Sequence, residues 1–296
     1  MFKTPLMTEE VVQTDALFTV TEVDMGWTKT NGENWRRIPN SQFRGLVRVK
    51  PINNVPIPFV LNVVSGTYKL VQNYELYTHI ENIIKDNIIP DRLKNVVIND
   101  KSSHHGRVTF REYLFHDIKA KINEKSTVSF RLIIKNVYGG GSLRVIYGAI
   151  DTYCINGMIT GEYEANYFRH TSGLEIPMIG KSIGPALDKF VEETDRMRTW
   201  ARTYVGHDEA MKLFKRIAAS PRMIEKMNSE WMREADDRGQ TKWALYSTLT
   251  NYSSSQDGTF KIKQTEHDTV QATLHARELN VHKWITLPEF VLAGES

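Results

Sequence analysis

The feature that most constrains the fold is a run of three glycines, Gly139 to Gly141, between two stretches rich in β-branched and aromatic residues. The flanking stretches read STVSFRLIIKNVY (126–138) and SLRVIYGAIDTYCI (142–155). Such residues favour the pleated strand, and glycine adopts the left-handed backbone of a tight turn without a steric penalty. The sequence therefore predicts a long β-hairpin in the middle of the chain.

The hydrophobic pattern changes along the chain from a period of two to a period near 3.6. RVTFREYLF (107–115) alternates as a strand does, whereas apolar residues after Gly180 recur at helical spacing. One helix is predicted after Asn73, which we expect to cap it. Further helices are predicted over 187–204, 208–219, 221–235 and 241–253. Three prolines in KPINNVPIPF (50–59) predict a loop or a sheet edge.

Strands followed by helices favour an α+β fold, with an antiparallel β-sheet built on a long central hairpin and backed by C-terminal helices. The chain then divides into four parts. These are a flexible N-terminal arm (1–25), a β-rich domain with a basic sheet face (26–180), a helical region that packs on the sheet or forms a lobe (181–255), and a C-terminal tail (256–296).

Composition limits the class of protein. No apolar run approaches the length of a membrane span, and the first fifteen residues lack the apolar core of a signal peptide. A single cysteine, Cys154, excludes a disulfide within the chain and a Cys-rich zinc site. We therefore expect a cytoplasmic protein without contact with a membrane.

Positive charge is concentrated in the segment that carries the strand signals. Residues 101–150 hold nine Lys or Arg against three Asp or Glu, a net charge of +6, whereas the whole chain carries +3. The remainder of the chain therefore sums to −3. A cationic sheet is suited to a polyanion, because neutralising phosphates releases their counterions.

The alternation of side chains selects candidate binding residues. Arg131 and Lys135 are an even number of residues apart and share one face of their strand, while Phe130, Leu132 and Ile134 point to the other face. Arg131, Lys135 and Arg144 are the main candidates, and Arg169 and His170 the second. The other predicted contacts are Lys119, Lys121, Lys125 and, for stacking on bases, Tyr138. A solvated sheet face with aromatic residues in the core is the alternative reading.

Catalysis finds little support in the motifs. Cys154 as a nucleophile with His170 as its base is a weak alternative, because Cys154 has apolar neighbours and small buried cysteines are usually structural. No phosphate-binding loop or zinc-protease motif occurs. The prediction is a protein without catalytic residues, metal ion or cofactor.

Four segments carry a family resemblance: TYKLVQNYELY (67–77), the hairpin with its sequel (139–161), RHTSG (169–173) and TKWALYSTLTNY (241–252). They resemble the phage/plasmid-like protein family of unknown function, domain of unknown function nine-three-two. Where that family carries Asn-Ala after the tyrosine of the helical block, this chain has Ser247-Thr248. The positions that match its middle block are Asn136, Gly140, Ser142, Cys154, Asn156, Gly157, Arg169, His170 and Thr171.

The resemblance implies an origin on a mobile element, near recombination and replication functions. A hairpin-rich sheet backed by helices is also similar to the single-strand annealing recombinases of phages, which assemble into rings or filaments. We therefore expect single-stranded DNA binding and strand annealing in phage recombination or replication, by a homo-oligomer and without covalent chemistry. Host or phage replication proteins are further expected partners. The alternative is an interaction protein that acts on a host protein, as a defence inhibitor or in the virion.

Overall fold

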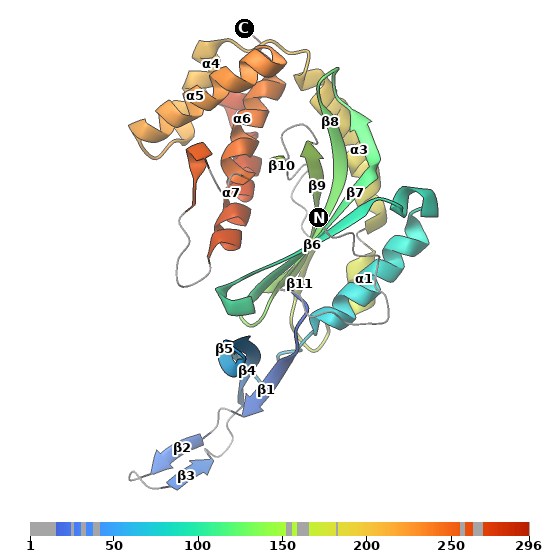
Figure 1. Ribbon diagram of the computed structural model, residues 1–296, viewed down its shortest axis with the longest axis vertical. Helices are drawn as coiled ribbons and strands as arrows, with labels where there is room; N and C mark the ends of the chain where they lie inside the picture. The colour runs from blue at the N-terminus through green and yellow to red at the C-terminus, as the bar shows by residue number, and fades with distance from the viewer. Residues whose placement is uncertain are drawn as a thin grey trace.

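A central antiparallel sheet organises the computed structural model (Figure 1). Its strands run in the order β10-β9-β8-β7-β6, and β11 also pairs with β9. The strands are β6 (Val96–Ser103), β7 (Val108–Lys121), β8 (Thr127–Val137), β9 (Ser142–Asp151), β10 (Asn156–Met158) and β11 (Asn166–Arg169). The structure describes residues 16–24, 27–30, 34–37, 42–151, 156–158, 166–181, 183–254, 258–262 and 269–295.

The predicted central hairpin is confirmed as the pair β8 and β9. Its register runs from Val128 opposite Asp151 to Lys135 opposite Arg144. The turn requires glycine at Gly139, which has a φ of 71°. A Cβ atom there would lie 2.6 Å from the side chain of Asn62, which belongs to β5 (Val55–Ser65) of a separate sheet.

Helices cover both faces of the sheet (Figure 1). On one side, α3 (Ile183–Trp200) contacts β8 and β9, and α1 (Asn73–Asn87) lies beside α3 and α2 (Ile176–Gly180). On the other side, α7 (Val270–Trp284) contacts β6 and α6 (Lys242–Ser254) contacts β10. The remaining helices are α4 (His207–Ile217), α5 (Pro221–Arg238), α8 (Pro288–Val291) and the short 3-10 helices η1 (Pro90–Leu93), η2 (His104–Gly106) and η3 (Gly258–Phe260). The fold is α+β, as the sequence predicts.

The main core lies between the sheet and α3. Phe115, Phe130 and Phe190 pack in a series, the first pair tilted and the second edge to face, with ring centroids 5.4 Å apart at each step. Phe130, Leu132 and Ile134 are fully buried, so the predicted inward face of β8 is confirmed.

The predicted C-terminal tail is wrong over 270–284, where the chain forms α7. Leu274, Val281 and Ile285 are buried, and their spacing of seven and four residues places them on one side of the helix. The ionisable side chains of His275 and Glu278 are buried on the same side. They interrupt the apolar stripe that would otherwise mark the helix.

Asn73 does not cap α1. The residue at the cap position is Gln72, which makes no side-chain cap bond. Asn73 is buried, and its Nδ2 donates to the Ala16 carbonyl oxygen (2.6 Å) and to Thr109 Oγ1 (3.1 Å). Its Oδ1 accepts a bond from Asn136 Nδ2 (2.8 Å). The asparagine therefore ties α1 to β7 and β8.

A second, three-stranded sheet, which we call the small sheet, has the order β1-β4-β5. Its strands are β1 (Val20–Asp24), β4 (Phe43–Ile52) and β5 (Val55–Ser65), and β2 (Trp27–Thr30) pairs with β3 (Asn34–Arg37) separately. The segment 50–59 is therefore a hairpin end and not a loop, although β5 is an edge strand as its prolines predict. The predicted arm contains β1 at 20–24, and residues 1–15 lie outside the described residues.

Candidate nucleic-acid interface

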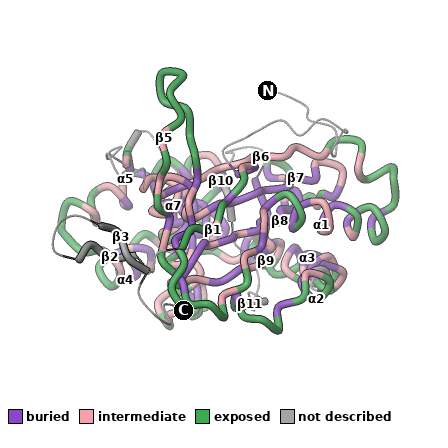
Figure 2. Tube along the Cα trace, turned by 90° about the horizontal axis from the view of Figure 1, so that it is seen from below, coloured by how far each residue is buried: buried purple, intermediate pink, exposed green. Residues whose placement is uncertain are grey.

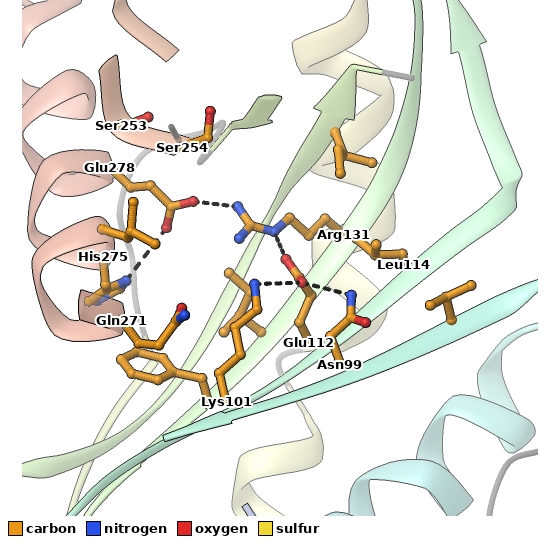
Figure 3. A pocket seen from close by; sticks show the side chains of 15 residues that line it. Asn99, Lys101, Glu112, Leu114, Arg131, Ser253, Ser254, Gln271, His275 and Glu278 are labelled. Carbon is orange, nitrogen blue, oxygen red and sulfur yellow. Dashed lines mark hydrogen bonds and ion pairs between the residues drawn. The ribbon is translucent and has the colours of Figure 1, made fainter. Parts of the chain in front are cut away.

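Arg131, the first candidate, lies under α7 and is only 7% exposed. Its Nε donates to the Glu112 carboxylate and its Nη1 to Glu278 Oε1 of α7 (2.7 Å) (Figure 3). Glu112 also accepts bonds from Asn99 Nδ2 (3.1 Å) and Lys101 Nζ (3.4 Å). The prediction that Arg131 faces a DNA strand is wrong, because α7 covers this part of the sheet and both of these nitrogens are bound to carboxylates.

A cavity of about 240 Å³ surrounds this ion-pair network. Figure 3 shows Glu112, Arg131 and Glu278 pointing toward one another between the strands and α7. Burial alone would raise the pKa of Glu112, but the charges of Arg131 and Lys101 outweigh it and lower that pKa to about 2. These acids and bases neutralise each other, so the network ties α7 to the sheet.

His275 also lines this cavity, from α7. Burial lowers the pKa of His275, and its Nδ1 lies 3.7 Å from Glu278 Oε2. The imidazole is therefore neutral near pH 7. It extends the network along α7 without adding a charge to it.

The strand register brings a different set of cations together at the open end of the same sheet face. Lys135 lies opposite Arg144, and Arg144 lies opposite Tyr167 of β11. Residues directly opposite on antiparallel strands point to one face, so the three form a row across β8, β9 and β11. Arg169 follows Tyr167 by two residues on the same face of β11. We call Lys135, Arg144, Tyr167 and Arg169 the basic row.

Lys135 is half-buried, and no carboxylate of the described residues forms an ion pair with it. Its Nζ lies 5.5 Å from the centroid of the Phe110 ring. Burial, with a contribution from the charge of Arg144, lowers the pKa of Lys135 to about 8. A phosphate beside this ammonium group would relieve the repulsion between the two cations.

Tyr167 is the aromatic member of the basic row and is 52% exposed. The guanidinium carbons of Arg144 and Arg169 lie 5.4 and 5.8 Å from its ring centroid. Arg144 Nε also donates to Ser142 Oγ (3.0 Å). Tyr167 is not among the residues predicted from the sequence. The alternation around half-buried Phe168 is the signal that would have placed Tyr167 on the exposed face of β11.

Two other predicted contacts are buried. Tyr138 is fully buried and lies against Phe18, with ring centroids 6.0 Å apart. His170 is 6% exposed, stacks on Tyr68 at 5.0 Å, and has its Nδ1 3.2 Å from the Lys69 carbonyl oxygen. Burial lowers the pKa of His170, so it is neutral near pH 7. Neither side chain can stack on a base or pair with a phosphate, and His170 instead fixes the chain just after β11.

The three remaining lysines, Lys119, Lys121 and Lys125, are exposed at the other end of β7 and in the turn before β8. Lys119 lies opposite Ser129, whereas Phe110, beside the basic row, lies opposite Lys135. Because the register shifts at a bulge between Phe115 and Lys119, the separation is taken along β8, where Ser129 and Lys135 are six residues apart, which corresponds to about 20 Å. These lysines therefore do not belong to the basic row. Lys125 Nζ donates to the Asp237 carbonyl oxygen (2.6 Å) at the end of α5.

Cys154, the nucleophile of the weak alternative, lies outside the described residues. Within the part of the chain that the structure describes, His, Cys, Asp and Glu side chains do not gather in groups of three or more that could hold a metal ion. None of the described helices has the length and apolarity needed to cross a bilayer.

These features define an α+β protein whose antiparallel sheet has helices on both faces. The basic row lies at the end of this sheet that is nearest the glycine turn. The chain belongs to the family described as domain of unknown function DUF932, whose profile matches residues 60–276. No curated protein and no solved structure matches the chain.

Proposed function

We propose that this protein binds single-stranded DNA across the open end of its central sheet and promotes strand annealing. The observation that carries the proposal is the register, which places Lys135 and Arg144 in one row with exposed Tyr167. Neighbouring strands lie about 4.8 Å apart. The row is therefore a narrow cationic strip that matches the backbone of one strand better than the width of a duplex.

The proposed chemistry is non-covalent. Lys135, Arg144 and Arg169 neutralise phosphates and release counterions, and the Tyr167 ring stacks on a base without reading its identity. The Tyr167 ring is 52% exposed, and two guanidinium groups lie 5.4 and 5.8 Å from its centroid, so a stacked base would have phosphate partners nearby. Such contacts leave the pairing edges of the bases free, which annealing to a complementary strand requires. In this proposal the protein acts in the cytoplasm of the host cell.

The test compares two triple variants that each remove three positive charges. We expect Lys135→Ala/Arg144→Ala/Arg169→Ala to weaken binding of a labelled single-stranded oligonucleotide in fluorescence anisotropy. The slope of log K against log salt should become shallower by about 2, because each phosphate contact on a single strand contributes about 0.7.

The matched control is Lys119→Ala/Lys121→Ala/Lys125→Ala, which should retain the slope of the wild type. Thermal melts of both variants establish that they are folded. Equal slopes for the two triple variants would show that the basic row does not contact DNA, and the proposal would fail.

A second candidate function, binding to another protein, is favoured by an apolar surface on the small sheet. Val49, Val60 and Phe43 are 55%, 61% and 60% exposed there. Nucleic acid has no attraction for such a surface, because it offers no charge.

A further inference from the structure

The small sheet has one face packed against the protein and one bare face. Its inner face is covered, since Leu46, Leu61 and Val64 are buried with Val20 around Tyr138. Across β4 and β5, the outward pairs are Phe43 with Ser65, Gly45 with Val63, Val47 with Val60, Val49 with Pro58 and Pro51 with Pro56. Val23 of β1 lies opposite Gly45 and extends the face. We call this set the outer face.

The outer face carries no ionisable side chain. A bulge where the register shifts between Leu46 and Val47 keeps it continuous, because Leu61 turns inward while Val60 and Val63 stay outward. Figure 2 shows the hairpin of β4 and β5 projecting from the body of the molecule, exposed along its tip. Contiguous apolar patches of this kind on soluble proteins mark interaction sites.

Prolines remove two backbone donors from the free edge of β5 near the tip of the hairpin. The hairpin turns on two residues, Asn53 and Asn54, with φ values of 50° and 65°. In a two-residue turn the flanking pair, Ile52 and Val55, is the hydrogen-bonded one. Positions 56 and 58 therefore direct their backbone nitrogens to the open edge. Both are proline and have no N–H to donate. This part of the edge therefore cannot donate to an added strand, whereas the outer face stays open to a partner.

We propose that a second copy of this chain packs on the outer face, sheet against sheet. Two such faces meet without repulsion between like charges. Antiparallel sheets with one apolar side commonly pack face to face, with their strands about 30° apart. The ten residues of β4 and the eleven of β5 span about 36 Å on two strands, and the five residues of β1 add a third strand over about 16 Å. This footprint of roughly 400 Å² is about half of the ~800 Å² that each partner contributes to a standard interface.

Its consequence for DNA rests on the proposed function. The outer face and the basic row are connected through the glycine turn, where Asn62 Nδ2 of β5 donates to the Gly139 carbonyl oxygen (2.8 Å). Copies joined in this way would bind one DNA strand with more than one basic row. Each additional row raises the affinity through effective concentration.

The experiment measures mass in the absence of DNA, by size-exclusion chromatography with light scattering over a range of concentrations. We expect the wild type to be larger than a monomer and Val49→Lys/Val60→Lys to elute as a monomer. The matched control is Val191→Lys/Val291→Lys, which introduces the same charges at valines that are 60% and 46% exposed on α3 and α8. It should keep the mass of the wild type.

A monomeric wild type at every concentration would overturn the proposal, whether the outer face is then free, covered by residues 1–15 or taken by a different protein. An assembled Val49→Lys/Val60→Lys variant would also overturn it. The Lys135→Ala/Arg144→Ala/Arg169→Ala variant should assemble like the wild type. Failure of assembly and failure of DNA binding are therefore observed separately.

Discussion

Among single residues, Arg131 is a charged residue of the sheet whose ion pairs hold two elements together and do not face solvent. Its guanidinium joins Glu112 of β7 to Glu278 of α7, and all three side chains are at least nine-tenths buried. Removing one partner of a buried ion pair leaves the other charge without compensation.

We expect Arg131→Met to lower the free energy of unfolding by about 3–5 kcal/mol, because two buried carboxylates lose their cation. Urea denaturation followed by circular dichroism measures the loss. Lys119→Met removes an exposed charge and should change stability by no more than about 0.5 kcal/mol. Equal stabilities for the two variants would contradict the structural role of Arg131. DNA binding by folded Arg131→Met should keep the salt dependence of the wild type.

Lys135 makes the proposed DNA binding depend on pH. With a pKa of about 8 in the free protein, its ammonium group is mostly present at pH 7 and mostly lost at pH 9. Deprotonation removes one phosphate contact, so affinity should fall as the pH rises through 8. The salt slope should become shallower by about 0.7 between pH 7 and 9. His275, whose pKa burial lowers, stays neutral throughout this range.

The control is Lys135→Arg, since a guanidinium group stays protonated at pH 9. Anisotropy with oligo-dA, whose bases do not titrate in this range, compares the two proteins. An equal decline in both would assign the pH dependence to another group.

Among the elements, those with one regular pattern could be predicted from the sequence. The hairpin β8–β9 and the helices α3 to α5 have regular strand or helix periodicity, whereas α6 is buried on nearly all sides. In α7, buried His275 and Glu278 interrupt the pattern. In the hairpin β4–β5, prolines obscure strands that tolerate them because their nitrogens face an open edge.

For the candidate site, the sequence predicts the face on which a side chain lies but not whether another element covers that face. Alternation correctly places Arg131 and Lys135 on one face, but it does not tell which part of that face another element covers. Helix α7 divides the two, burying Arg131 and leaving Lys135 half-exposed. Tyr138 has the residue type of a stacking platform, yet the small sheet packs around it. The alternation of FRGLVRV (43–49) does indicate β4, but not what that strand covers, and α7 has no regular pattern.

The glycine turn gives a prediction for the central hairpin. Gly139 and Gly140 both have positive φ, 71° and 67°, so alanine at either position should cost about 1–2 kcal/mol of stability. A Cβ atom at Gly139 would also lie 2.6 Å from Asn62, whereas at Gly140 its nearest neighbour would be 3.7 Å away. We therefore expect Gly139→Ala to be the more destabilising of the two in thermal or urea unfolding. The reverse order would show that Asn62 does not limit the turn.

In the molecule as a whole, we assign DNA binding to the central sheet and contact between copies to the small sheet. The two sheets are in contact at the glycine turn. In the central sheet, Lys135 and Arg144 of the basic row lie within four residues of the glycine turn. The small sheet contacts that same turn. Tyr68 Oη accepts a bond from the Gly139 backbone nitrogen (3.1 Å) beside the bond made by Asn62. Contact between copies through the small sheet would therefore act close to the basic row.

Proline at positions 56 and 58 also limits how far contacts between copies can extend. An amyloid fibril grows when strands from further copies pair with the edge strand of a sheet. Each pairing uses backbone N–H donors, which these two positions lack. A protein with an exposed apolar hairpin is ordinarily at risk of forming fibrils in this way. Here the tip of the hairpin cannot donate to such growth, so an added strand would have to pair with β1 or with β5 beyond its prolines.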